Sequence, residues 1–222
     1  MLEVLSVTEE NYLKSICMLS QVEQSTVSTN AIAAYMGTSA ASVTDMLKRL
    51  TEKGLTIYEK YKGVSLSKSG KDLAIQLIRK HRLWETFMVE KLNFTWDEVH
   101  HIAEQLEHIQ SEQLIDRLDA FLDFPRFDPH GDPIPDKEGK FEHRQQILLS
   151  KLEIGQKAII VGVNEHSSIF LRHLAQVNLK IGTNITILEK FDFDQSLKLA
   201  LDDGTVLSVS NKVCQNLFTN PL

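Results

Sequence analysis

Cysteine is nearly absent from this chain of 222 residues, which has only Cys17 and Cys214. Two cysteines far apart, each among apolar neighbours, are too few for a disulfide scaffold or a thiolate zinc site, so both are predicted to be small buried hydrophobic residues. No apolar run approaches the ~18 residues of a membrane span. The N-terminus also lacks a cationic start followed by an apolar segment. We therefore expect a cytoplasmic protein with no membrane partner.

Proline is scarce except in one stretch. Four of the five prolines lie in "PRFDPHGDPIPDKEGKF", between residues 125 and 141, which predicts a loop or linker. The hydrophobic pattern is helical before it and strand-like after it, with one short helix around "SIFLRHLAQVN". We expect a mainly α protein with a small β module, divided into four parts: residues 1–70, 71–124, 125–149 and 150–222.

The first part has the pattern of a winged helix. In "TSAASVTDMLKRLTEKG", apolar residues recur at helical spacing and Gly54 ends the helix, while the alternating stretch that follows, around Lys62-Gly63, predicts a hairpin. In such an arrangement the second helix of the pair enters the major groove of DNA. The alternatives are a small helical core without a ligand and a winged helix that binds protein. The predicted DNA-binding residues are Ser39, Ala41, Ser42, Thr44, Lys48, Lys60 and Lys62.

Excess positive charge, common in DNA-binding proteins, is also missing, since the net charge is −6. The distribution of charge still permits DNA binding, because six of the eight basic residues of the first 75 gather where the recognition helix and hairpin would face phosphates. These residues are Lys48, Arg49, Lys53, Lys60, Lys62 and Lys68.

Lysine is missing from "HHIAEQLEH", residues 100–108, where histidines and glutamates gather. If one helix runs from a capping box at Thr95 to Phe121, four of these side chains share an arc of about 100°: His100, Glu104, Glu107 and His108. Crowded carboxylates with imidazoles favour a transition-metal site without thiolates. The preceding helix adds an i, i+4 pair, His81 and Glu85. The alternative is a solvated helix face.

The remaining histidines lack partners at helical spacing. His101 lies outside the arc, and the other four are predicted to be surface residues: His130, His143, His166 and His173. The apolar stripe farther along the chain predicts either a two-fold interface or an intramolecular core: Leu114, Ile115, Leu118, Phe121 and Leu122.

Several segments, in order along the whole chain, resemble the diphtheria toxin repressor family of metal-dependent transcriptional regulators. They are "TEENYLKSI", "RKHRLWETF", "VHHIAEQLEHIQSE", "DPHGDPIP" and "LRHLAQVNLKIGTNITIL". The resemblance implies an N-terminal winged helix, a helical dimerisation domain and a C-terminal SH3-like β-barrel. It also implies a homodimer that binds double-stranded operator DNA when loaded with Mn²⁺ or Fe²⁺ and represses metal-uptake genes.

The same resemblance implies two metal sites. The primary site would comprise Asn11, Glu104, Glu107 and His108, and the neighbouring site would comprise His81, Glu85, His100 and Glu165. Iron-type members have Cys where this chain has Glu104, so Mn²⁺ is favoured over Fe²⁺. Lys14 stands where short manganese regulators have Glu, so a closely spaced metal pair is not expected.

Two other functions compete with this interpretation. A His/Glu metal cluster can activate water in an enzyme, but the chain has no HExxH motif, and a winged helix would be unexplained. A winged-helix regulator could instead sense an organic effector, with the His/Glu cluster serving only as structure. We therefore predict a regulator and not an enzyme.

Overall fold

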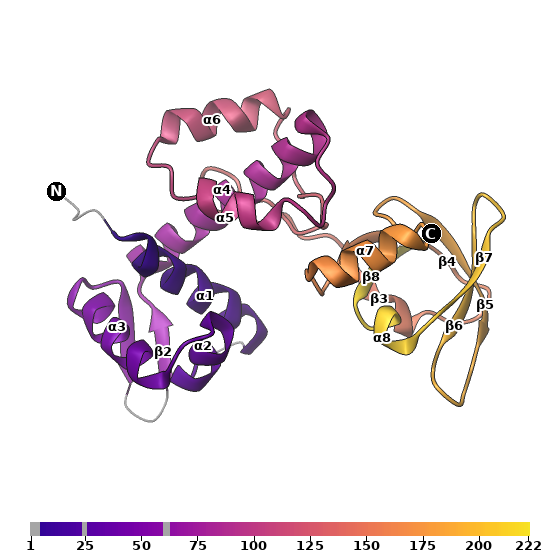
Figure 1. Ribbon diagram of the computed structural model, residues 1–222, viewed down its shortest axis with the longest axis horizontal. Helices are drawn as coiled ribbons and strands as arrows, with labels where there is room; N and C mark the ends of the chain where they lie inside the picture. Colours follow the sequence, from indigo (N-terminus) through magenta and orange to yellow (C-terminus); the bar gives the residue numbers. More distant parts are fainter. Residues whose placement is uncertain (1–4, 24–25, 60–62) are drawn as a thin grey trace. The chain divides into compact units, whose positions relative to one another are not determined.

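The computed structural model describes residues 5–23, 26–59 and 63–222 (Figure 1). Contacts divide the chain into two compact units. The first unit comprises Met1–His81, Glu104–Gln113 and Pro135–Lys140, and the second comprises Arg82–Ala103, Leu114–Ile134 and Phe141–Leu222. No helix in the described ranges has the length and apolar character to cross a membrane.

The first unit begins as a helix-turn-helix followed by a hairpin, as the sequence predicts. Its elements are α1 (Val7–Glu23), α2 (Thr29–Met36), α3 (Ala40–Glu52), β1 (Thr56–Glu59) and β2 (Gly63–Leu66). The strands are antiparallel, with Thr56 opposite Leu66. Lys60 and Lys62, predicted to contact DNA, lie outside the described residues.

Side-chain caps fix where these helices begin and end. The hydroxyl of Ser39 accepts the backbone N–H of Ser42 at the start of α3, and Gly37 ends α2 in the left-handed conformation, with φ 62°. The apolar stripe of α3 is buried, and so is the apolar stripe of α1 in the same unit. The buried residues of the two stripes are Leu13, Ile16, Cys17, Val43, Leu47 and Leu50.

Three helices follow the hairpin: α4 (Lys68–Leu92), α5 (His100–Leu106) and α6 (Glu112–Phe121). Only half of the predicted capping box forms: Glu98 Oε2 accepts the backbone N–H and the hydroxyl of Thr95, at 3.0 and 2.8 Å, whereas the backbone N–H of Glu98 bonds the carbonyl of Thr95 and α5 begins only at His100. The prediction of one helix from residue 95 to 121 is wrong, since α5 ends at Leu106 and five residues separate it from the start of α6 at Glu112. Residues 107–111 therefore lie in a non-helical connection.

The second unit contains a six-stranded antiparallel sheet in the order β3-β8-β4-β5-β6-β7. Its strands are β3 (Ile147–Leu148), β4 (Lys157–Val163), β5 (Asn184–Lys190), β6 (Leu197–Leu201), β7 (Val206–Val209) and β8 (Leu217–Pro221). The helices α7 (Ser168–Gln176) and α8 (Asn211–Cys214) belong to the same module (Figure 1). Cys214 is buried in its core, as predicted, and so is Cys17 in the first unit.

A smaller core in the same unit lies under α6. It is formed by Leu83, Ile115, Leu118, Leu122 and Ile134. The predicted stripe of α6 is thus divided, because Leu114 and Phe121 are 40% and 63% exposed while the rest of the stripe is buried.

Candidate metal centre and nucleic-acid interface

The residues after α5 contact α1 within the first unit. The Nδ1 of His108 lies 2.5 Å from Glu10 Oε2, and the other Glu10 oxygen accepts the side-chain amide of Gln110 at 2.7 Å. Because a carboxylate only accepts, the proton of His108 is held on Nδ1. The lone pair therefore lies on Nε2, the tautomer that suits a metal ligand whose other nitrogen is held by a carboxylate.

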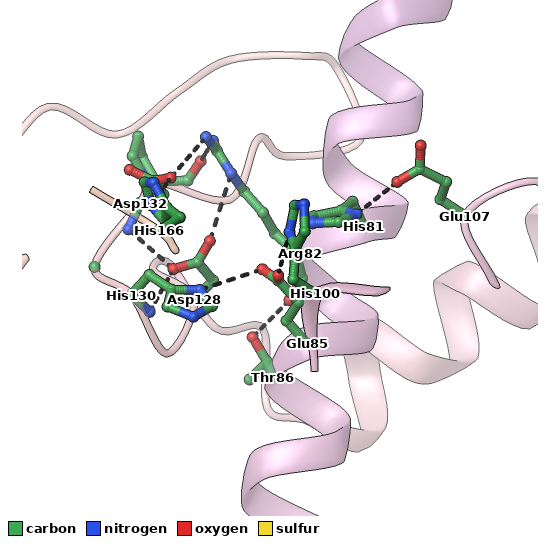
Figure 2. Close-up of polar contacts among 12 residues, drawn as sticks. His81, Arg82, Glu85, Thr86, His100, Glu107, Asp128, His130, Asp132 and His166 are labelled. Carbon is green, nitrogen blue, oxygen red and sulfur yellow. Dashed lines mark hydrogen bonds and ion pairs between the residues drawn. The ribbon is translucent and has the colours of Figure 1, made fainter. Parts of the chain in front are cut away.

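Glu107 is 1% exposed and is held by two side chains of the same unit. Its Oε2 lies 2.5 Å from His81 Nδ1 and 2.6 Å from Lys14 Nζ (Figure 2 shows the His81 contact). Lys14 Nζ also approaches His81 Nδ1 at 3.2 Å. That approach is a close contact, since Nδ1 donates its proton to Glu107 and an ammonium has no acceptor.

Charge and burial oppose each other at Glu107. Burial alone would raise the pKa of this carboxyl, but the hydrogen bond from His81 and the charge of Lys14 outweigh it and hold the pKa below its ordinary value. Glu107 is therefore ionised at neutral pH.

Two buried atoms in this cluster have no hydrogen-bond partner among the described residues: Glu107 Oε1 and His108 Nε2. They lie 3.9 Å apart, beyond hydrogen-bonding distance. Buried polar atoms are nearly always satisfied in folded proteins. A carboxylate oxygen and an imidazole nitrogen that lie close together without hydrogen-bond partners fit a divalent cation, which each atom would coordinate through a lone pair.

The other two predicted primary ligands border this pair. Asn11 is half-buried on α1, next to Glu10 and one turn before Lys14, both of which contact residues 107–108. Glu104 is exposed on α5, one turn before His108. Partial burial is the largest cause that raises the pKa of Tyr35, and the charges of Glu104 and Glu107 raise it further. The two carboxylates therefore both lie near Tyr35. His101, which the sequence placed outside the arc, is exposed.

A second cluster is built inside the second unit around Glu85 of α4 (Figure 2). His100 Nδ1 lies 3.4 Å from Glu85 Oε1, and His130 Nδ1 lies 3.5 Å from Glu85 Oε2. The ligand atoms of Glu85, Asp128 and His130 all lie within 4.8 Å of one another, and all three residues are buried. Of the predicted neighbouring site, the structure thus brings Glu85 and His100 together, and His81 lies one turn before Glu85 on α4.

The prediction that His130 is a surface residue is wrong, since it is 2% exposed. Its Nε2 hydrogen-bonds the carbonyl of Trp96 at 2.8 Å, and Asp128 Oδ1 accepts its backbone N–H at 2.8 Å. Gly131, with φ 88°, makes this loop possible, because a Cβ there would collide with the carbonyl of Val161. The stretch read as a linker is therefore, at this point, an ordered and buried loop.

The electrostatics of this cluster are strongly perturbed. Burial alone would lower the pKa of His130, but Glu85 and Asp128 raise it to about 9. Burial and the charges of Asp132 and Glu85 raise the pKa of Asp128 to about 6. Groups perturbed in this way mark candidate functional sites, although a structural ion-pair network has the same signature.

Structural ion pairs are present at the cluster as well. Arg82 lies 3.5 Å from Asp128 and 3.3 Å from Asp132, and His166 Nε2 lies 3.3 Å from Asp132. His166 was predicted to be a surface residue, but it is half-buried and packs its ring 5.3 Å from that of His130. The predicted ligand Glu165 adjoins it, and its carboxylate accepts the backbone N–H of Ser167. His143 and His173 are exposed, as predicted.

The predicted recognition helix presents its first turns to solvent. Ser39, Ala41, Ser42 and Lys48 are exposed, and Thr44 is half-buried. The hydroxyl of Thr44 donates to the carbonyl of Ala40 at 2.8 Å, so its methyl group is the part left for a base edge. Lys53, expected to face phosphates, is instead paired with Glu9 at 2.9 Å.

Fold and site together define a winged-helix protein with a buried His/Glu cluster next to its DNA-binding elements. Family models match nearly the whole chain. The N-terminal DNA binding domain of iron dependent repressors matches residues 4–64, their metal binding and dimerisation domain matches residues 67–136, and the FeoA domain matches residues 147–221.

Individual relatives agree with these matches. The iron-dependent repressor IdeR of Mycobacterium tuberculosis is 35% identical over 128 residues, which are 58% of this chain and 55% of that protein. The diphtheria toxin repressor of Corynebacterium glutamicum is 29% identical over 194 residues, and the match covers 82% of this chain and 84% of that protein. The solved structure of a manganese-dependent transcriptional repressor in complex with manganese is 32% identical, with a TM-score of 0.85. The match covers 96% of this chain and 100% of that chain.

The chain spans about a fifth to about half of the length of several curated relatives that it matches. It covers the full length of the solved manganese-dependent repressor. The chain therefore belongs to the diphtheria toxin repressor family of metal-dependent transcriptional repressors, which are DNA-binding proteins and not enzymes.

Proposed function

We propose that this protein is a Mn²⁺-activated repressor, with Fe²⁺ as the alternative metal, that binds double-stranded operator DNA as a homodimer and represses metal-uptake genes. The observation that carries the proposal is the pair of buried, unsatisfied atoms, Glu107 Oε1 and His108 Nε2, beside α1 of the DNA-binding domain.

In this proposal the primary site consists of Glu107 and His108, completed by Asn11 and Glu104. A bound ion supplies positive charge between carboxylates that otherwise repel each other. Glu10 holds the His108 ring in the required tautomer from α1, and Gln110 holds Glu10. Three oxygen donors and one imidazole form the kind of ligand set that suits Mn²⁺, and the carboxylate of Glu104 supports it over Fe²⁺.

The chain's own residues connect this site to the DNA-binding elements. The α1 helix presents Glu10 and Lys14 to residues 107–108 and buries Leu13, Ile16 and Cys17 on its apolar side. Tightening the 107–108 segment against α1 therefore restricts the unit that also carries the recognition helix α3. Metal binding then favours the arrangement that two half-sites of an operator demand, which is allostery by a shared contact.

We also propose metal binding in the second unit, near Glu85. The neighbouring site of His81, Glu85, His100 and Glu165 is supported by the helical spacing of the first pair and by the Glu85–His100 contact. The buried Asp128 and His130 offer further ligands on Glu85. In the metal-free protein the protonated His130 supplies positive charge, so an ion bound by its imidazole would release that proton.

The proposed organisation keeps the four parts 1–70, 71–124, 125–149 and 150–222. Exposed Leu114 and Phe121 on α6 supply part of the dimer interface in this proposal, while their buried neighbours belong to the subunit's own core.

Operator binding tests the function directly. Double-stranded DNA selected from a random pool by the full chain with Mn²⁺ would serve as the probe, and its affinity would be measured with Mn²⁺ and with chelator. We expect operator binding to require Mn²⁺. We also expect Glu104→Ala and His108→Ala to abolish operator binding at micromolar Mn²⁺. Equal affinity with metal and with chelator would refute the proposal.

A further inference from the structure

Lys14 is placed unusually for a lysine, because its ammonium group lies inside the cluster and not in solvent. Its side chain is 15% exposed, and Nζ lies 2.6 Å from Oε2 of the nearly inaccessible Glu107. Lysines normally keep the ammonium group in water and bury only the aliphatic stem. Burying the charge here is tolerable only because it meets an opposite charge.

The pairing leaves Glu107 divided between two functions. Oε2 accepts hydrogen bonds from Lys14 and His81. Oε1 has no hydrogen-bond partner among the described residues and lies 3.9 Å from His108 Nε2. One carboxylate thus holds an internal cation on one oxygen and offers the other oxygen to an external one.

Only the carboxylate group of Glu107 would separate a divalent ion on Oε1 from the ammonium of Lys14 on Oε2. Two positive charges that close repel each other strongly in a buried, weakly screened site. The charge of Lys14 therefore stabilises Glu107 when no metal is bound and opposes the metal when it binds.

We propose that Lys14 is the resident counterion of Glu107 and that its charge sets the metal concentration at which the protein responds. This inference rests on the proposed function, since it concerns the affinity of the same site. It assigns Lys14 a positioning and tuning role without making it a ligand.

The test is a comparison of Lys14→Met with the wild-type full chain. Mn²⁺ affinity would be measured by competition with a fluorescent chelator, and thermal unfolding would be measured in EDTA. We expect Lys14→Met to bind Mn²⁺ at least about tenfold more tightly and to unfold at a lower temperature without metal. Lys14→Arg, which keeps the charge, should bind Mn²⁺ within about threefold of wild type.

Lys53→Met is the matched control, because Lys53 also pairs with a buried glutamate, Glu9, at 2.9 Å and also stabilises the domain. It should lower the unfolding temperature while leaving Mn²⁺ affinity unchanged. A general loosening of the fold would instead change both variants alike.

The outcomes separate this inference from the proposed function. If the wild-type chain binds no Mn²⁺, the proposed function fails. If the wild type binds Mn²⁺ and Lys14→Met binds it equally or more weakly, the role of Lys14 is refuted. Should Lys14→Met not fold in EDTA, Lys14→Gln, which keeps a hydrogen-bond donor, is judged by the same affinity criterion.

Discussion

Replacing Glu10 by Gln is expected to weaken Mn²⁺ binding although Glu10 is not a proposed ligand. Both Glu10 oxygens accept hydrogen bonds, one from His108 Nδ1 at 2.5 Å and one from Gln110 Nε2 at 2.7 Å. A glutamine has one acceptor oxygen and one donor amide, so it cannot accept from both partners. One of the two contacts must be lost, and the His108 ring loses its fixed tautomer or its support.

The magnitude follows from the role of a carboxylate that orients a metal-binding histidine. Loss of such a partner typically weakens metal affinity by about 10–100-fold, or about 1.4–2.7 kcal/mol. The low exposure of both side chains, 11% each, keeps water from replacing the lost contact. We therefore expect the upper part of that range for Glu10→Ala and the lower part for Glu10→Gln.

The assay is a Mn²⁺ titration of the full chain by competition with a chelator, with unfolding temperature measured in parallel. Glu9→Gln is the control, because Glu9 is equally buried on α1 but pairs with Lys53 and caps the helix at Ser6. Its Mn²⁺ affinity should equal that of wild type. If Glu10→Gln also bound Mn²⁺ within twofold of wild type, the reasoning about His108 would be wrong.

Three further predictions concern other parts of the molecule. Because the pKa of His130 is raised from 6.5 to about 9, its protonated form contributes on the order of 3 kcal/mol below pH 6.5, and this is lost as pH rises to about 9. The unfolding temperature in EDTA should fall over that range, and His130→Gln should flatten the fall. Lys48→Ala should weaken binding to the selected DNA and reduce its salt slope by about 1; an unchanged slope would remove Lys48 from the interface. Leu118→Ala should cost about 2–5 kcal/mol of unfolding free energy, whereas Phe121→Ala, at an exposed position, should cost less than about 0.5 kcal/mol and shift sedimentation toward monomer.

Local patterns in the sequence predicted most of the fold. The stripe of α3 and the hairpin that follows were readable because each depends on neighbours within one or two turns. The C-terminal β module was predicted from strand-like runs, although β8, which pairs with both β3 and β4, was not among them. Its pairing is set by partners more than fifty residues away.

The end of α5 shows why part of the site could not be predicted. The sequence placed Glu107 and His108 on one helix with His100 and Glu104, but Glu107 and His108 lie beyond the helix end, and His100 contacts Glu85. What brings Glu107 and His108 to α1 is tertiary contact with Glu10 and Lys14. No helical spacing reports such contacts.

The second cluster was missed for a related reason. Asp128 and His130 lie in an irregular loop, where neither the helical nor the strand period applies, and their partner Glu85 is more than forty residues away. The signal available was compositional, a histidine between two aspartates in a proline-rich loop. Solvent-exposed loops have the same composition, so burial could not be inferred from it.

The non-helical connection between α5 and α6, residues 107–111, has a consequence for how this protein can diverge in evolution. Residues 107–110 receive side chains from two separate helices, Glu10 and Lys14 from α1 and Lys80 and His81 from α4. Glu10, Lys14 and Lys80 can each change while the proposed ligands stay the same. Substitutions at such positions can thus change the metal affinity of related proteins, and a comparison of the ligands alone would overlook them.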